Sequence, residues 1–157
     1  MRLGACLGVG IDIVEPCGFV FDDRRIRRAG MDYGAMAHVE RHSSWEAYCE
    51  EAYCESAAAG RHVLLTTKST VPHLSFRFQA DDRLILGRES SGVPAEVAAF
   101  ADTALRIPMT DRARSLNVVT AGAIVLAEAL RQTGTWPANA STPQPAPDQL
   151  RDQSRDQ

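Results

Sequence analysis

The chain has 157 residues, of which 45% are hydrophobic and 24% are charged; 17 Lys and Arg against 20 Asp and Glu give it a formal net charge of -3. This length fits one soluble domain with its own core and is too short for two full domains. No apolar run approaches the ~18 residues of a membrane helix, and the first residues make a poor signal peptide. The negative charge excludes a protein that coats nucleic acid indiscriminately. We therefore expect a cytoplasmic protein with no membrane partner.

The cysteines and histidines predict no metal centre. The four cysteines form no C-x-x-C pair and accompany no export signal, which is typical of free thiols in a reducing compartment; they are Cys6, Cys17, Cys49 and Cys54. His38 and His42 lie four residues apart with Glu40 between them, but the order is wrong for an H-E-x-x-H zinc helix. We expect both histidines to be structural or solvated.

Short apolar runs alternate with helical patterns along the chain. Buried strands are predicted over residues 11–14, 63–66, 84–86 and 104–107, because these runs are short and rich in aliphatic residues. Helices are predicted to end at Gly8-Val9-Gly10, to run from Asp22-Asp23 to Gly30, to start at a capping box of Ser43 and Glu46, and to run from Pro94 to about Asp102. This alternation predicts an α/β fold with a parallel sheet, which binds ligands at the carboxyl ends of its strands.

The last predicted helix differs from the others. Residues 116–130 are apolar on nearly every side, so the helix must be buried in the core or against another subunit. A dimer interface is the simpler explanation, since small domains seldom enclose a helix completely. The Pro- and Gln-rich segment that follows lacks the apolar residues of a core. We expect a domain over residues 1–134 and a disordered tail over residues 135–157.

Polar loops follow three of the predicted strands. They are Thr66-Thr67-Lys68, Gly87 to Gly92, and Pro108 to Asn117, and together they can line one crevice, although each alone is typical of a plain connection. Gly87 stands where the backbone can approach a ligand.

The sharpest charge feature lies near the amino terminus. Arg24, Arg27 and Arg28 share one face of a predicted helix. They can contact an RNA phosphate backbone, or they can form a solvated face partly neutralised by Asp22 and Asp23.

The sequence from Leu84 to Pro94 resembles the second motif of the SPOUT RNA methyltransferases, the knotted SpoU–TrmD class, and residues 107–117 resemble the third. Residues 13–16, 27–33 and 65–68 are similar to the small single-domain members that 2'-O-methylate the wobble nucleotide of tRNA. The resemblance extends from about Arg2 to about Gly134. It implies a deep C-terminal trefoil knot, S-adenosylmethionine as cofactor, tRNA as partner and an obligate homodimer.

The resemblance also implies roles for single residues. Leu65, Gly87, Ile107 and Ser115 would hold the cofactor, largely through backbone groups. Glu89 and Asn117 would brace the knot loops. We assign the RNA backbone contacts to Arg24, Arg27 and Arg28.

Arg2 matches the arginine to which the family assigns deprotonation of the 2'-hydroxyl. Because arginine stays protonated, action together with an RNA phosphate, or stabilisation of the alkoxide, is physically easier than a neutral guanidine. Family members carry a strand and a Pro-x-Asn-x-Gly loop before this arginine. We therefore expect a fold without its first strand, from a missed upstream start codon or from a truncated form. A catalytically impaired knotted dimer and a methyltransferase acting on rRNA are the alternatives.

Overall fold

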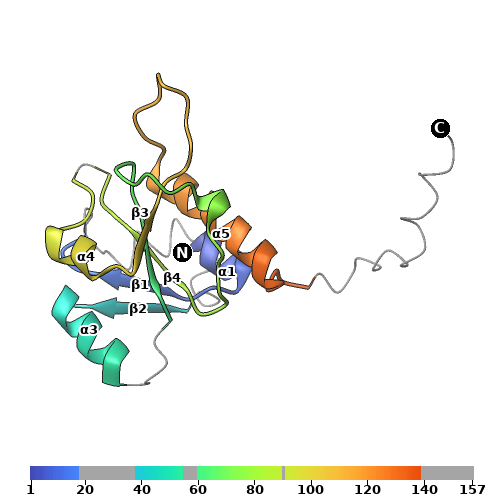
Figure 1. Ribbon diagram of the computed structural model, residues 1–157. Coiled ribbons are helices and arrows are strands. Elements are labelled where there is room, and N and C mark those ends of the chain that lie inside the picture. The colour runs from blue at the N-terminus through green and yellow to red at the C-terminus, as the bar shows by residue number, and fades with distance from the viewer. Residues whose placement is uncertain (18–37, 55–59, 90, 139–157) are drawn as a thin grey trace, which may run out of the picture.

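The computed structural model describes residues 1–17, 38–54, 60–89 and 91–138 (Figure 1). In chain order the elements are α1 (Arg2–Leu7), β1 (Ile11–Val14), β2 (Val39–His42), α3 (Trp45–Cys54), β3 (His62–Leu65), the short 3-10 helix η2 (His73–Ser75), β4 (Arg83–Leu86), α4 (Ala95–Phe100), β5 (Thr103–Leu105) and α5 (Val118–Thr133). The helix predicted from Asp22 to Gly30 and nearly all of the predicted tail lie outside the described residues.

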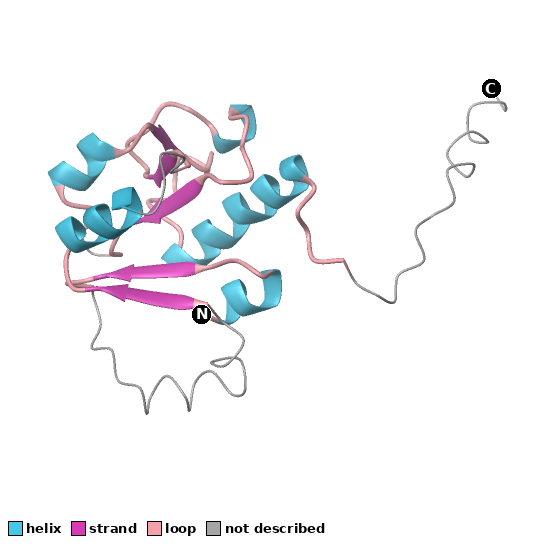
Figure 2. Ribbon diagram, turned by 90° about the horizontal axis from the view of Figure 1, so that it is seen from below, coloured by secondary structure: helices cyan, strands magenta, loops and turns pink. Residues whose placement is uncertain are grey.

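The strands form two parallel sheets rather than the single sheet that the sequence predicts. One sheet has the order β4-β3-β5, and the other pairs β1 with β2 (Figure 2). The reason is that β1 finds its ladder partner in β2, which runs from Val39 to His42 and was not predicted. This stretch has one aliphatic residue among three polar ones, so it shows none of the apolar signal of a buried strand.

Tyr48 on α3 joins the two sheets through its side chain. Its ring packs edge-on against His42 of β2 and against His62 of β3. Its hydroxyl lies 2.9 Å from His62 Nε2, and Arg83 Nη1 of β4 donates to it over 3.2 Å. Burial raises the pKa of the Tyr48 hydroxyl, so the hydroxyl stays neutral while it bonds His62 and Arg83.

Helices cover both faces of the β4-β3-β5 sheet, as predicted. Successive residues of β3 point to opposite faces. His62 contacts Tyr48 and Phe100, on the side of α3 and α4. Val63 belongs to the buried core with Val125 of α5, on the other side. The main buried core of the described residues therefore lies between this sheet and α5.

α5 has one buried side and one exposed side within the single chain. Gly122, Val125 and Leu130 are buried. Val119 is 60% exposed and Ile124 is 38% exposed. The chain's own core therefore does not bury α5 on every side, and burial of its exposed side against a second subunit stays a prediction. The knot and the absence of the first strand also stay predictions.

One predicted helix end matches the structure and one predicted start does not. Gly8, in the left-handed conformation with φ 66°, ends α1 as expected. Ser43 was predicted to cap α3, but Ser44 does so by accepting the Ala47 backbone N–H at 3.2 Å. Because the helix begins at Trp45, its third position is Ala47 rather than Glu46, and the predicted capping box does not form.

Candidate functional site

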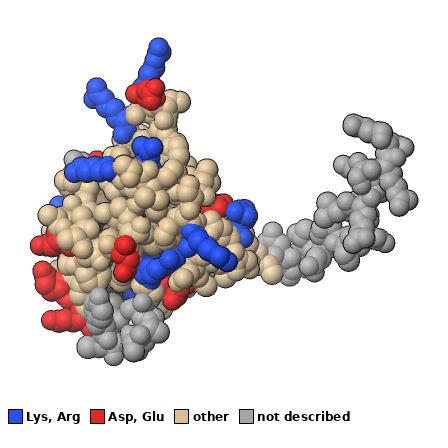
Figure 3. All heavy atoms as spheres, in the orientation of Figure 1, with Lys and Arg blue, Asp and Glu red and all other residues tan. Residues whose placement is uncertain are grey.

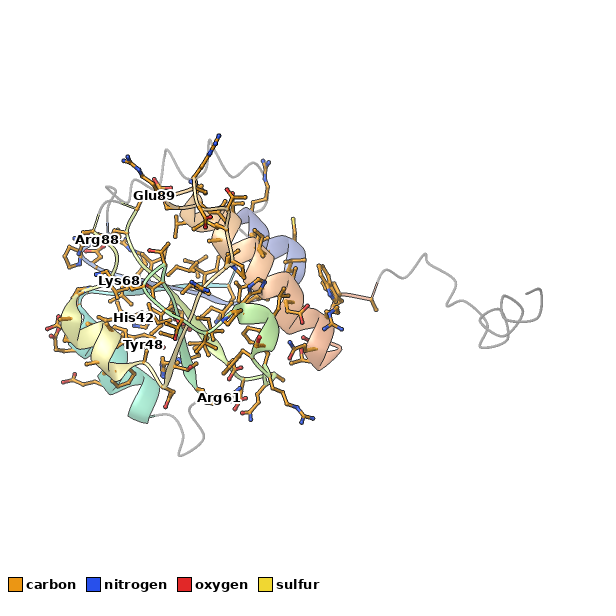
Figure 4. All side chains as sticks on the ribbon, turned by 45° about the horizontal axis from the view of Figure 1, so that its top comes forward. His42, Tyr48, Arg61, Lys68, Arg88 and Glu89 are labelled. Carbon is orange, nitrogen blue, oxygen red and sulfur yellow. The ribbon has the colours of Figure 1, made fainter. Side chains whose placement is uncertain are left out.

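The carboxyl ends of three neighbouring strands lie together at one edge of the larger sheet. Leu65 of β3 is in register with Leu86 of β4 and with Leu105 of β5. The residues that follow each strand therefore leave from the same edge, and Thr66 N–H donates to the Leu105 carbonyl at 2.9 Å. Lys68, Arg88 and Glu89, which lie in two of these loops, occupy the same end of the molecule in Figure 4. The predicted gathering of the loops is confirmed.

Two of the predicted cofactor-binding residues have side chains that pack against the core. Leu65 and Ile107 pack against the buried cluster of Val63, Phe78 and Leu105. Since the aliphatic side chains face the core, these positions offer a ligand their peptide groups rather than their side chains. Their predicted role in holding the cofactor through the backbone stays a prediction.

The loop after β4 closes on itself around Gly87. Arg88 N–H donates to the Gly92 carbonyl at 3.0 Å, and Gly92 N–H donates back to the Arg88 carbonyl at 2.8 Å. A Cβ on Gly87 would lie 2.6 Å from the Gly92 carbonyl carbon. Glycine is thus required because the loop's own backbone occupies this space, and the approach of a ligand to the Gly87 backbone stays a prediction.

Glu89 and Asn117, both predicted to brace the loops, meet across the two loops. Asn117 Nδ2 donates to Glu89 Oε1 at 2.5 Å. Asn117 Oδ1 accepts the backbone N–H groups of Val119 at 2.9 Å and Thr120 at 3.3 Å, so the same side chain caps α5. The loop after β4 is thereby fixed to the start of α5.

The loop between β5 and α5 rises beyond the rest of the described chain (Figure 1). Ser115 lies in it with an exposed side chain, and Ala113 N–H closes a turn onto the Thr110 carbonyl at 2.9 Å. Leu116, beside Ser115, is 38% exposed. An exposed hydroxyl and an exposed apolar side chain therefore stand next to each other at this edge.

The remaining predicted site residues are Arg2 on α1 and three arginines of the segment that follows β1. Arg2 is the first residue of α1 and its side chain is exposed. Arg24, Arg27 and Arg28 lie outside the described residues. Their roles stay predictions.

Sequence reasoning missed Ser69, which organises the loop after β3. Its hydroxyl donates to the Ala104 carbonyl at 2.6 Å and accepts the Val71 N–H at 3.0 Å. Arg106 N–H then donates to the Val71 carbonyl at 2.8 Å, and His73 N–H donates to the Arg106 carbonyl at 2.9 Å. A serine near the start of a loop is a weak signal of such a turn, and no pattern in the sequence indicates its partner on β5.

A second polar cluster lies on the smaller sheet. His42 is buried and its Nε2 lies 3.0 Å from Asp12 Oδ1, while Glu40 stands beside Asp12 in register. One ligand atom of each residue lies within 4.8 Å of the others, a spacing that suits a cation. Asp12 and Glu40 also contribute to raising the pKa of Arg83, after its larger partner Tyr48, so a protein cation already lies near these carboxylates. We interpret the cluster as structural, as the sequence predicts for His42.

The described helices include none that is both long and apolar enough to cross a membrane. Residues 1–127 match the family model described as the SpoU rRNA methylase family. The chain is 50% identical over 133 residues to a tRNA (cytidine(34)-2'-O)-methyltransferase from Ancylobacter novellus, an alignment that covers 85% of this chain and 82% of that one.

Solved structures agree with the sequence match. A structure titled as giving insight into the 2-OH methylation of C/U34 on tRNA is 32% identical, covers 83% of each chain and has a TM-score of 0.73. An rRNA methyltransferase from Sinorhizobium meliloti with bound AdoMet is 28% identical, covers 83% of this chain and 49% of that one, and has a TM-score of 0.70. With a family model spanning most of its length and a relative of the same size sharing half of its residues, the chain belongs to the SpoU rRNA methylase family.

Proposed function

We propose that this protein transfers a methyl group from S-adenosylmethionine to the ribose 2'-hydroxyl of the wobble nucleotide, nucleotide 34, of tRNA. The observation that supports this most is the bridge between Glu89 and Asn117, which fixes the loop after β4 to α5 at the strand ends. It occurs in a chain half identical to an enzyme named for this reaction.

The groups at the strand ends suit the proposed cofactor. S-adenosylmethionine has a flat adenine ring and polar ribose and amino acid parts, so it needs apolar walls and a few hydrogen-bonding groups. Leu86 is 43% exposed and Leu116 is 38% exposed, and both flank the loops. Ser115 adds an exposed hydroxyl, and the peptide groups of Gly87 and Ile107 follow β4 and β5.

Each of the proposed site residues has a distinct part. Leu65, Gly87, Ile107 and Ser115 hold the cofactor, the first three through the backbone. Glu89 and Asn117 hold the loops in place. The cofactor supplies an electrophilic methyl group on a sulfonium, and the reaction then requires an oxygen nucleophile with its proton removed.

Arg2 acts at the ribose hydroxyl in this proposal. A 2'-hydroxyl is a poor nucleophile until it loses its proton, and a guanidinium is always charged. Arg2 therefore stabilises the alkoxide that develops, and an RNA phosphate accepts the proton. Its exposed side chain at the start of α1 leaves it accessible to RNA.

The proposal also includes the extent of the folded domain and its association into a dimer. The folding unit covers residues 1–134, with the knot at its C-terminal part, and residues 135–157 form a tail. Two copies associate through the exposed side of α5 in the cytoplasm. Arg24, Arg27 and Arg28 add contacts to the RNA backbone.

The experiment uses the full chain, labelled S-adenosylmethionine and unmodified tRNA transcripts. We expect label at nucleotide 34, mapped by nuclease digestion and mass spectrometry, and none in a transcript whose nucleotide 34 is 2'-deoxy. Arg2→Ala is expected to retain cofactor binding and to lose most of the label. Label that persists in the 2'-deoxy transcript would overturn the proposed position of methylation.

An rRNA substrate is the second candidate, because the family is named for rRNA and the Sinorhizobium meliloti relative is an rRNA methyltransferase. Ribosomal RNA in a parallel assay separates the two, since label only in rRNA would replace the tRNA proposal. Cofactor binding without label in either RNA would favour the catalytically impaired dimer.

A further inference from the structure

The cationic side chains at the strand-end loops differ from those elsewhere in the described chain. Arg61 is paired with Asp82, Arg131 with Glu128 and Arg41 with Glu15. At the loops, by contrast, five exposed cations have no ion pair with any described carboxylate: Lys68, Arg88, Arg106, Arg112 and Arg114. The four that do not directly follow a strand, Lys68, Arg88, Arg112 and Arg114, remain available to an external anion, as the exposed Arg77 does elsewhere on the surface.

The acidic residues among the loops do not cancel this charge. Residues 66–72, 87–93 and 106–117 contain five Lys and Arg and two Asp and Glu, a net of +3 within a chain of net charge -3. Of the two acids, Glu89 already accepts from Asn117. In Figure 3 blue side chains gather over the loop between β5 and α5, whereas red ones gather on the side of α3 and α4. The positive charge is thus concentrated where the three loops meet.

We propose that Lys68, Arg88, Arg112 and Arg114 form a basic rim that binds the phosphates on either side of the methylated ribose. This inference rests on the proposed function and specifies how its RNA substrate is held. A ribose presented at its 2'-hydroxyl carries a phosphate on the neighbouring 3'-carbon and another on the 5' side. Any RNA that reaches the loops therefore brings two anions within a few ångströms of them.

The residue types suit this partner. Arginine recognises a phosphate with two parallel hydrogen bonds, and lysine acts as a compact point charge. The rim comes from three different loops, so it surrounds the strand ends rather than forming a linear stripe. Its contacts would position any sequence of RNA equally, because phosphates contain no base information.

The test compares double variants of the rim with a matched control. Lys68→Ala with Arg88→Ala, and Arg112→Ala with Arg114→Ala, each remove two charges from the loops. The control is Arg77→Ala, an exposed arginine whose carbonyl accepts from Arg61. Arg61 lies at the opposite end of the molecule from Arg88 in Figure 4. Binding of the full chain to an unmodified tRNA transcript is measured over a series of KCl concentrations, and S-adenosylmethionine binding is measured by calorimetry.

Each double variant is expected to weaken RNA binding severalfold and to lower the slope of log affinity against log salt by about 1.4, which is two contacts at ~0.7 each on a single strand. Arg77→Ala is expected to keep the wild-type slope, and all variants should keep cofactor affinity. Wild-type slopes in both double variants would overturn the rim while leaving methylation intact. A wild-type protein that binds neither tRNA nor rRNA would overturn the proposed function itself, and the rim with it.

Discussion

Asn117 holds Glu89 with its amide nitrogen and the first turn of α5 with its amide oxygen. One side chain therefore performs two tasks that single substitutions can separate. Asn117→Asp keeps an oxygen for the helix cap but places an acceptor against the Glu89 carboxylate. Asn117→Ala removes both.

We expect Asn117→Asp to lower S-adenosylmethionine affinity about tenfold or more, the equivalent of one hydrogen bond to a charged group, with little loss of helix stability. Asn117→Ala should lose a further ~1 kcal/mol of unfolding free energy with the cap. Calorimetry and urea unfolding measure the two effects. Glu89→Gln, which still offers an amide oxygen to Asn117, is the control and should bind nearly as wild type. Undiminished cofactor affinity in Asn117→Asp would contradict the bracing role.

Substitution by alanine is expected to destabilise the protein at one glycine and to be tolerated at another. A Cβ on Gly60 would lie 1.8 Å from the Asp81 carbonyl oxygen, which is backbone and cannot swing away. A Cβ on Gly122 would meet the end of the Leu86 side chain at 2.9 Å. Gly60→Ala should lower the free energy of unfolding by roughly 3 kcal/mol. Gly122→Ala should change it by about 1 kcal/mol or less, since helix propensity offsets the shift of Leu86. Urea unfolding that ranks the two variants in the reverse order would refute this.

His62 makes the stability depend on pH below neutrality. Burial, with Arg83 nearby, lowers the pKa of His62 below the ordinary histidine value of about 6.5. The unfolded chain therefore takes up a proton before the folded one does as the pH falls. The free energy of unfolding is therefore not reduced by His62 above about pH 6.5, and it decreases as the pH falls below that value. We expect unfolding free energy to fall from pH 7 to pH 5, and His62→Gln to remove part of that slope. His38→Gln, at an exposed position, is the control; equal slopes in all three proteins would exclude this role for His62.

The exposed side of α5 predicts a subunit contact. Val119 is 60% exposed in the single chain although it lies on the most apolar helix. If a second copy covers it, Val119→Asp should convert the dimer into monomers. Leu74→Asp, at a side chain that is 65% exposed on η2, is the matched control and should remain dimeric. Light scattering measures the mass, and a Val119→Asp protein that stays dimeric would rule out this face.

The strands of the larger sheet could be predicted from sequence because their residues are aliphatic and buried. The runs around Val63, Leu84 and Ala104 follow that pattern closely. β2 could not be predicted, because its buried position holds His42 where an aliphatic residue is usual. His42 is held there by its contacts with Asp12 and Tyr48. Such a strand depends on tertiary partners that leave no periodic signal.

The site shows the same division. The family resemblance implied that Glu89 and Asn117 brace the loops; the structure places the two side chains in contact, and the bracing role stays a prediction. The packing of Gly87 against Gly92 could not be predicted, because it depends on a backbone closure that spacing does not reveal. Ser69 was missed for the same cause: its partner Ala104 is 35 residues away.

The separation of the strands into two sheets has a consequence for how the enzyme can be dissected. The groups proposed to hold the cofactor follow β3, β4 and β5, whereas Arg2 opens the helix that leads into β1. Tyr48 ties these two parts together by ring contacts with His42 and His62. Under these proposed roles, affinity for the methyl donor depends on the larger sheet and the rate of methyl transfer depends on the smaller one. A substitution that removes the ring contacts of Tyr48 should lower the rate of methyl transfer, while the protein still binds S-adenosylmethionine to saturation.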